Sequence, residues 1–171
     1  MIRPAVVEDV PALARVQVRA WLHAYSDFMD PDEIAARPVE VREPQWRAAL
    51  TDPSSPATTV VFDQDGAVAG FATTGPARDD DLDPGTGELY AIYVDPPAQG
   101  AGVGRALHAE AVRRLAAAGF GRATLWTFAA NEQAIAFYER LGWRPDPASP
   151  AQGWVGCDRA APSMRYVRDV P

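Results

Sequence analysis

Three glycines stand within five residues in the segment Gln99–Gly104, which reads QGAGVG. Glycine lacks a Cβ atom, so the backbone N–H groups of such a segment can turn toward a ligand at close range. The segment lies between a predicted strand and a predicted helix, and the N-terminus of a helix carries a partial positive charge. We therefore predict a phosphate or pyrophosphate site here. The alternative is a tight strand-to-helix turn that binds no ligand.

The spacing of these glycines argues against two common phosphate-binding motifs. A dinucleotide fingerprint, G-x-G-x-x-G, has Arg105 in place of its last glycine when counted from Gly100, and Leu107 when counted from Gly102. The acidic residue expected about twenty positions later is also missing, because residues 119–128 contain no Asp or Glu. A Walker loop requires a lysine, and the chain has none. Nicotinamide dinucleotides are therefore poor candidates for this site.

The composition excludes further classes of function. The 171 residues carry a formal net charge of −7, from 23 acidic residues and 16 basic residues that are all Arg, so we expect no nucleic-acid partner. The absence of lysine removes Schiff-base catalysis. Because Cys157 is the only cysteine and the histidines number two, we expect no disulfide and no metal site. Neither a membrane-spanning stretch nor a signal peptide is visible, so we expect a cytoplasmic protein without membrane attachment.

Helices come first in the predicted order of elements. Apolar residues at helical spacing predict a helix over Glu8–Tyr25 and a second between Asp32 and Leu50, broken near Pro38 and Pro44. The predicted strands are Thr58–Phe62, Ala67–Thr74, Glu88–Val94, Ala123–Phe128 and Ser163–Arg168, and the later helices are Gly102–Ala118 and Asn131–Leu141. The run Asp63–Gly66 predicts a hairpin between the first two strands. This order indicates an α/β domain with a mixed sheet.

The segment Asp79–Asp83 holds four aspartates and resembles the start of a calcium-binding loop. A calcium loop needs a glycine where this chain has Pro84, and a bidentate glutamate where it has Tyr90. We therefore predict a solvated loop without a metal.

Two segments resemble the acetyl-CoA motifs of the GNAT superfamily of N-acetyltransferases. Gln99–Gly104 matches the Q/R-x-x-G-x-G/A loop, and Asn131–Trp143 is similar to the N-x-x-A-x-x-F-Y-x-x-x-G-F/W helix. Leu89–Pro96 resembles the fourth strand of that family. The resemblance implies one GNAT domain over residues 1–171, with a twisted, mostly antiparallel mixed sheet flanked by helices. It also implies direct transfer of the acetyl group of acetyl-CoA to a primary amine.

The resemblance further implies which residues bind the cofactor. Backbone groups around Ile92 and Val94 would pair with the pantetheine arm, and the amides of Gly100–Arg105 would hold the pyrophosphate. Asn131 would hydrogen-bond the cofactor, cap its helix, or do both. The cofactor-binding residues implied are Ile92, Val94, Gln99, Gly100, Ala101, Gly102, Val103, Gly104, Arg105 and Asn131.

Tyr138 and Glu88 are the catalytic candidates. Transfer from a thioester expels a thiolate, and the resemblance implies that the Tyr138 phenol donates a hydrogen bond or a proton to it. The alternative for Tyr138 is a place in an apolar core stripe. Glu88 is the candidate base, because period-2 alternation along its strand would put it on the same face as Ile92 and Val94. An amine that arrives neutral, or that loses its proton through water, would need no such base.

The acceptor is expected to be a small-molecule or peptide amine, and the acidic balance favours a cationic one by steering. Trp21, His23 and Tyr25 end the first predicted helix, either as an aromatic wall of the acceptor site or as helix-end packing. The main alternative to an enzyme is a non-catalytic module that binds and senses acyl-CoA. A third reading is an enzyme with another acyl donor. The resemblance also allows a homodimer.

Overall fold

The computed structural model describes residues 1–30, 32, 35–149 and 162–171, so Cys157 lies outside the described residues. Its strands form one sheet in the order β1-β2-β3-β4-β5-β7-β6, in which only the β4–β5 pair is parallel. The strands are β1 (Ile2–Pro4), β2 (Thr58–Gln64), β3 (Ala67–Pro76), β4 (Thr86–Val94), β5 (Arg122–Phe128), β6 (Arg144–Pro145) and β7 (Ser163–Asp169). The predicted mixed and mostly antiparallel sheet is confirmed.

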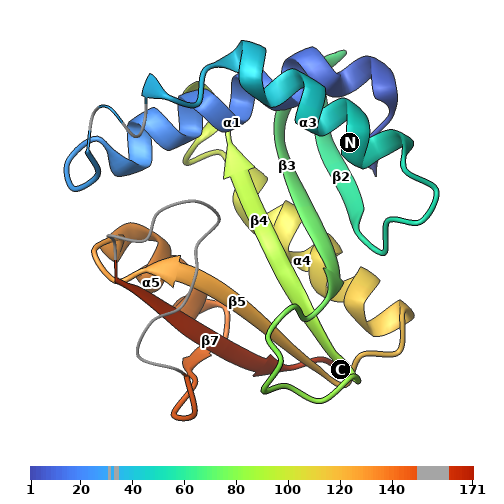
Figure 1. The fold of residues 1–171 in the computed structure, drawn as a ribbon, viewed down its shortest axis with the longest axis vertical. Coiled ribbons are helices and arrows are strands. Elements are labelled where there is room, and N and C mark those ends of the chain that lie inside the picture. The colour runs from blue at the N-terminus through green and yellow to red at the C-terminus, as the bar shows by residue number, and fades with distance from the viewer. Residues whose placement is uncertain (31, 33–34, 150–161) are drawn as a thin grey trace.

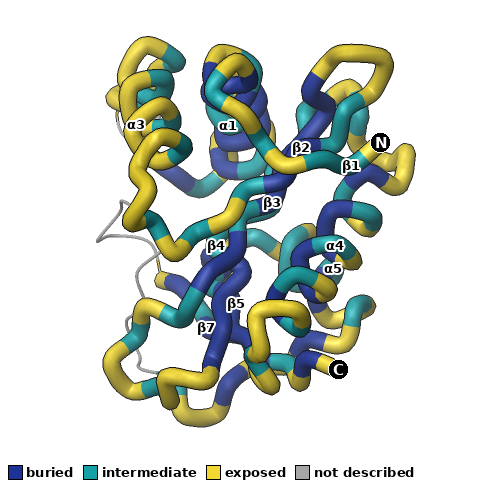
Figure 2. Tube along the Cα trace, turned by 90° about the vertical axis from the view of Figure 1, so that its right-hand side faces the viewer, coloured by how far each residue is buried: buried dark blue, intermediate teal, exposed yellow. Residues whose placement is uncertain are grey.

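Helices cover both faces of this sheet. Helices α1 (Val10–Tyr25) and α3 (Val39–Thr51) lie on one side, and α4 (Val103–Ala117) and α5 (Glu132–Arg140) lie on the other, as Figure 2 shows. Short 3-10 helices precede α1 at Val7–Asp9 and follow β4 at Pro96–Ala98. None of the helices in the described part of the chain is long and apolar enough to cross a membrane.

Alternating side chains of the central strands supply two cores. On β3, Phe71 packs with Leu13 and Val16 of α1, whereas the next residue, Ala72, packs with Leu107 of α4. Successive side chains of a strand point to opposite faces, so each face is buried under its own helix. The central strands are therefore held from both sides.

Strands β4 and β5 pair only where they begin. Thr86–Glu88 face Arg122–Thr124, and beyond this point the two strands diverge in Figure 1. The remainder of β5 stays paired with β7, and the remainder of β4 stays paired with β3. The sheet is therefore split between the C-terminal parts of β4 and β5.

The predicted second helix differs from the observed one at Pro44. Helix α3 begins directly after Pro38, as predicted, but it continues through Pro44. Proline inside a helix removes one hydrogen bond to the carbonyl four residues earlier, here that of Glu40. Both residues are exposed, so water can bond this carbonyl and the helix does not break. The earlier part of the predicted helix includes residues 33–34, which lie outside the described residues.

The acidic loop between β3 and β4 is anchored rather than only solvated, which corrects the prediction for Asp79–Asp83. Arg165 of β7 is fully buried, and its guanidinium contacts Asp79 at 3.3 Å, Asp81 at 2.7 Å and Asp146 at 2.8 Å. Asp79 also accepts a hydrogen bond of 2.8 Å from the Trp126 indole. Three carboxylates thus neutralise one buried cation and join the loop to β5 and β7.

We expect Arg165→Met to destabilise the protein by about 3 kcal/mol, because removing one partner of a buried ion pair leaves the other uncompensated. The side chain of Asp146 is only 2% exposed and would lose this partner. Urea unfolding measures the change. Arg113→Met is the control, since Arg113 pairs with Glu110 at a 65% exposed position and should cost less than about 1 kcal/mol. Equal losses in the two variants would contradict a central role for Arg165.

Candidate active site

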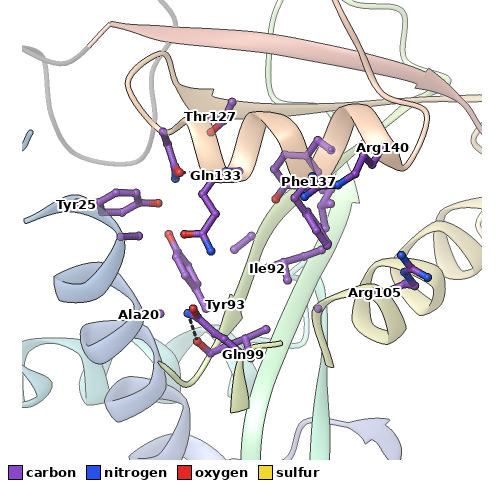
Figure 3. A pocket seen from close by; sticks show the side chains of 18 of the residues that line it. Ala20, Tyr25, Ile92, Tyr93, Gln99, Arg105, Thr127, Gln133, Phe137 and Arg140 are labelled. Atoms are coloured by element: carbon purple, nitrogen blue, oxygen red, sulfur yellow. Dashed lines mark hydrogen bonds between the residues drawn. The ribbon is translucent and has the colours of Figure 1, made fainter. Parts of the chain in front are cut away.

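A cavity of about 650 Å³ lies where β4 and β5 diverge (Figure 3). Residues 89–94 of β4 form one wall, and Trp126 and Thr127 of β5 face them. The lining from other elements comprises Ala20, Ala24 and Tyr25 of α1, Gln99, Gly100, Gly102, Gly104 and Arg105 of the loop and α4, and Asn131, Gln133, Ala134, Phe137, Tyr138 and Arg140 at α5. The cavity therefore joins the glycine segment to the face of α5 that carries Tyr138.

The glycine segment adopts a backbone that other residues rarely reach. Gly102 is the N-cap of α4 with a φ of 85°, and Gly100 has a φ of 78°. This left-handed region disfavours residues with a Cβ atom. The first N–H groups of a helix have no partner within the helix, so they are available to an anion. The segment thus has the backbone expected for a phosphate site, although Ala101 and Val103 are not among the lining residues.

Among the residues that the structure describes, no strand pairs with the cavity-facing edge of β4 beyond Glu88. Ile92 and Val94 lie on this stretch, as predicted, and both line the cavity. The Gln99 side chain donates a hydrogen bond of 3.4 Å to the Val94 carbonyl, drawn as a dashed line in Figure 3. An open strand edge presents backbone groups with which an extended chain can pair.

Asn131 fills the structural role that the sequence allowed. Its side-chain oxygen accepts a hydrogen bond of 3.0 Å from the backbone N–H of Ala134 and so caps α5. The same residue lines the cavity. The cap is therefore observed, and contact with a cofactor stays a proposal.

Tyr138 belongs both to the core and to the cavity wall. It is 9% exposed, and its ring packs edge-on against Phe137 and Trp143. Burial raises the pKa of the Tyr138 phenol well above its usual range, and the neighbouring Tyr93 adds to this effect. The hydroxyl therefore keeps its proton at neutral pH and can act as a hydrogen-bond or proton donor.

A β-bulge interrupts β4 at Tyr90. Leu89 pairs with Thr74 of β3 and Ala91 pairs with Thr73, so Tyr90 is an extra residue between two consecutive partners. An extra residue bends the strand and changes which face the following side chains occupy. Alternation counted from the start of β4 therefore fails beyond this point.

Because of this bulge, Glu88 does not share a face with Ile92 and Val94, and that prediction is wrong. A side chain at Gly87 would meet Leu115 of α4, so the next residue, Glu88, points away from α4. Ile92 and Val94 instead pack into the core that contains α4. The extra residue at the bulge reverses the alternation between them.

Glu88 is held in an ion pair on its own face. Its buried carboxylate accepts 2.5 and 3.1 Å hydrogen bonds from the Arg78 guanidinium and a 3.1 Å bond from the Arg78 backbone N–H. The same guanidinium lies 4.2 Å from the ring centre of Tyr90. Glu88 is not among the residues that line the cavity. This carboxylate is therefore neutralised away from the cavity wall.

Several lining residues were not singled out from the sequence. Gln133 and Arg140 share the cavity-facing side of α5 with Phe137, so the four- and three-residue spacing to Phe137 could have indicated them. Tyr93 and Trp126 carry no comparable local signal, because the bulge and the splitting of the sheet determine where they point. Of the first helix, Tyr25 packs on Trp21, Phe28 and Phe128, which confirms the helix-end packing. Tyr25 also lines the cavity, and its place in an acceptor site stays a prediction.

His108 of α4 is buried and accepts a hydrogen bond of 2.8 Å from the Trp143 indole. Burial, with a smaller effect of Arg168, lowers the pKa of His108 from 6.5 to about 4. Unfolded chains bind this proton near pH 6.5, whereas the folded protein does not until about pH 4. Stability contributed by neutral His108 is therefore complete above pH 6.5 and is lost as the pH falls toward 4.

Between pH 7 and pH 4, the free energy of unfolding should decrease in both the unaltered protein and His108→Gln. We expect the decrease to be smaller by about 3 kcal/mol in His108→Gln. Glutamine does not titrate, and its amide oxygen can still accept from the Trp143 indole. Denaturant titrations at several pH values provide the comparison. Parallel curves for the two proteins would show that His108 is not the titrating group.

Comparison with known families identifies the family of this chain. The model of the Acetyltransferase (GNAT) family matches residues 18–143, which include the glycine segment and all of α5. The chain belongs to the GNAT family of acetyltransferases. The resemblance stated from the two sequence motifs is thereby confirmed.

Curated relatives carry acetyltransferase names. The chain is 33% identical over 138 residues to YuaI of Bacillus subtilis, an uncharacterized N-acetyltransferase, covering 81% of this chain and 76% of that protein. It is 34% identical over 129 residues to the mycothiol acetyltransferase of Kocuria rhizophila. That match covers 73% of this chain but only 42% of the relative, so the chain spans less than half of the mycothiol enzyme's length.

Solved structures share the GNAT fold over almost the whole chain. The PaiA N-acetyltransferase of Thermoplasma acidophilum, in complex with coenzyme A, superimposes with a TM-score of 0.76 at 17% identity and covers 96% of both chains. YncA of Salmonella typhimurium, a putative acetyltransferase with its cofactor acetyl-CoA, gives a TM-score of 0.72 at 22% identity and covers 100% of this chain and 94% of that one.

Proposed function

We propose that this GNAT protein transfers the acetyl group of acetyl-CoA directly to a primary amine. The observation that carries the proposal is the juxtaposition, in one cavity, of an open β4 edge, a left-handed glycine turn at a helix N-terminus, and the protonated phenol of Tyr138. These three features supply backbone partners for an extended arm, donors for phosphate, and a donor for the leaving sulfur.

The residues present fit a coenzyme A thioester. Backbone groups around Ile92 and Val94 would pair with the pantetheine arm, and the amides of residues 100–105 would hold the pyrophosphate, with Arg105 adding positive charge. Asn131 would contribute any hydrogen bond that its cap leaves available. The bound thioester would supply an activated acetyl carbonyl.

The catalytic contribution of the chain would be mainly positional. Holding the thioester and the amine in one cavity removes much of the entropic barrier to their reaction. Tyr138 would donate to the sulfur as the carbon–sulfur bond breaks, while the amine nitrogen forms the new bond to the acetyl carbon. Because Glu88 pairs with Arg78 away from the cavity wall, we propose that the amine reacts as its free base or loses its proton through water.

The acceptor we propose is the primary amine of a small molecule or a peptide. Because mycothiol acetyltransferases are among the relatives, the amine substrate of those enzymes is the first acceptor to test. Polyamines, aminoglycosides and peptide amines are the other classes to include. Homodimer formation and a cytoplasmic location stay predictions.

Isothermal titration with acetyl-CoA, with CoA and NADH beside it, tests the donor. We expect micromolar binding of acetyl-CoA and none of NADH. A panel of primary amines with detection of the released thiol then separates an enzyme from an acyl-CoA sensor. Binding without release of CoA to any amine would favour the sensor, and absence of acetyl-CoA binding would overturn the proposed function.

A further inference from the structure

Trp21 and Tyr93 are joined by a hydrogen bond beside the part of the cavity that α1 lines. The Trp21 indole N–H donates to the Tyr93 hydroxyl oxygen at 2.6 Å. An indole N–H can only donate, so the hydroxyl oxygen is the acceptor and the phenol hydrogen points away from Trp21. The indole therefore sets the orientation of the Tyr93 hydroxyl.

Trp21 is fixed by its own surroundings. It is 5% exposed, and the edge-on ring of Tyr25 lies 5.0 Å from it. The guanidinium groups of Arg37 and Arg42 lie 5.4 and 5.6 Å from the centre of the indole. Aromatic and cation–π contacts of this kind hold a ring in one orientation. The donor that orients Tyr93 is thus held by the packing of α1 and the chain that follows it.

Tyr93 reaches the cavity with two other uncharged polar groups. In Figure 3 the side chains of Tyr25, Tyr93 and Gln133 point toward one another from α1, β4 and α5. A phenol and a carboxamide can each donate and accept hydrogen bonds. Polar groups without charge favour a neutral amine over an ammonium ion, because burial without a counter-charge lowers the pKa of an ammonium group.

Tyr93 lines the same cavity as the phenol assigned to the leaving group, Tyr93 from β4 and Tyr138 from α5. Tyr93 also contributes, after burial, to the raised pKa of Tyr138. A nucleophile held at Tyr93 would therefore sit near the bond that Tyr138 helps to break.

On the basis of the proposed acetyl transfer, we propose that Tyr93 holds the attacking amine, and that Trp21 positions Tyr93. The Tyr93 oxygen accepts one N–H of the neutral amine, which leaves the nitrogen lone pair directed at the acetyl carbon. Tyr93 takes no proton in this step. Its role is to hold the acceptor, whereas Trp21 acts only through it.

Steady-state kinetics of a double-mutant cycle tests this assignment, with the best amine of the panel as probe. We expect Tyr93→Phe to raise the KM for the amine about tenfold with little change in kcat, as for loss of a binding hydrogen bond. Trp21→Phe should raise that KM about threefold, because the Tyr93 oxygen is no longer oriented. The double variant should match Tyr93→Phe alone, since Trp21 acts through Tyr93. If the increases in amine KM of the two single variants multiply in the double variant, the positioning role of Trp21 is contradicted.

Trp46→Phe is the matched control. Like Trp21→Phe, this substitution removes an indole N–H that donates a hydrogen bond. The Trp46 indole donates to the side-chain oxygen of Gln17 on α1 at 2.8 Å, and neither Trp46 nor Gln17 lines the cavity. Its amine KM should stay unchanged. The affinity for acetyl-CoA, measured for every variant, reports whether the fold is intact. Tyr93→Phe leaves the Trp21 N–H buried without an acceptor and could fold poorly for that reason. The double variant lacks this donor, so in that case its amine KM is compared with that of Trp21→Phe.

The outcomes separate this inference from the proposed function. Normal acetylation with an unchanged amine KM in Tyr93→Phe would overturn the role of Tyr93 and leave the acetyltransferase intact. Failure of the unaltered protein to acetylate any amine of the panel would overturn the proposed function, and the inference with it.

Discussion

Gly102→Val should lower the affinity for acetyl-CoA by at least about 100-fold, which corresponds to the loss of one or two hydrogen bonds to a charged group. Gly102 caps α4 with a φ of 85°, a region that a β-branched residue hardly ever adopts. The valine would therefore pull the turn toward another conformation and move the N–H groups that face the cavity. Its side chain would also crowd the proposed pyrophosphate, although no protein atom lies within 4 Å of the Cβ position.

Gly119→Val is the matched control for this effect. Gly119 ends the same helix with a φ of 86°, and again nothing lies within 4 Å of its Cβ position. It is not among the cavity-lining residues. We expect the two variants to lose similar stability in thermal unfolding, while only Gly102→Val loses affinity in titration calorimetry. Unchanged acetyl-CoA affinity in Gly102→Val would mean that the segment is only a turn.

Tyr138→Phe should lower kcat about 100-fold, the lower range for loss of a positioned proton donor, while acetyl-CoA affinity changes less than about threefold. The phenol contributes to the breaking of the thioester and not to holding the nucleotide, so the loss falls on the chemical step. The ring remains in the wall against Phe137 and Trp143. Stopped-flow single turnovers with thiol detection measure the step directly.

Tyr166→Phe controls for the loss of a phenol at a buried position. Tyr166 of β7 is 1% exposed and bonds Glu139 at 3.1 Å, outside the cavity lining. This variant should keep its kcat even if some stability is lost. Equal rates for Tyr138→Phe and the unaltered protein would remove Tyr138 from the mechanism.

Local chemistry explains why so much of the fold was predictable. Helix α1 ends at Tyr25 as predicted, β2 and β3 meet at the predicted hairpin, and α4 stops before Gly119. Each of these features depends on neighbouring residues, through hydrophobic period, turn residues or a helix stop. The glycine segment was predicted in the same way, because its spacing lies within a single loop. The role of Tyr138 was implied by the resemblance to the GNAT superfamily, whose helix motif lies within a single helix of this chain.

Contacts between distant segments decided the rest. The bulge at Tyr90 arises from the pairing of β4 with β3, and it put Glu88 on a different face from Ile92 and Val94. Arg165 of β7 pairs with Asp79 and Asp81 of the loop between β3 and β4 and with Asp146, which follows β6. Spacing along the chain cannot reveal such partners, because the register between strands depends on packing across the whole sheet.

Residues a few positions apart thus predict the order of elements, the glycine turn and the helix that carries Tyr138. The folded structure determines where the sheet splits, which side chains face the cavity and which carboxylates are neutralised. Those outcomes follow from strand register and from pairing between charges that folding brings together. The Trp21–Tyr93 hydrogen bond, between residues 72 positions apart, belongs to this second group.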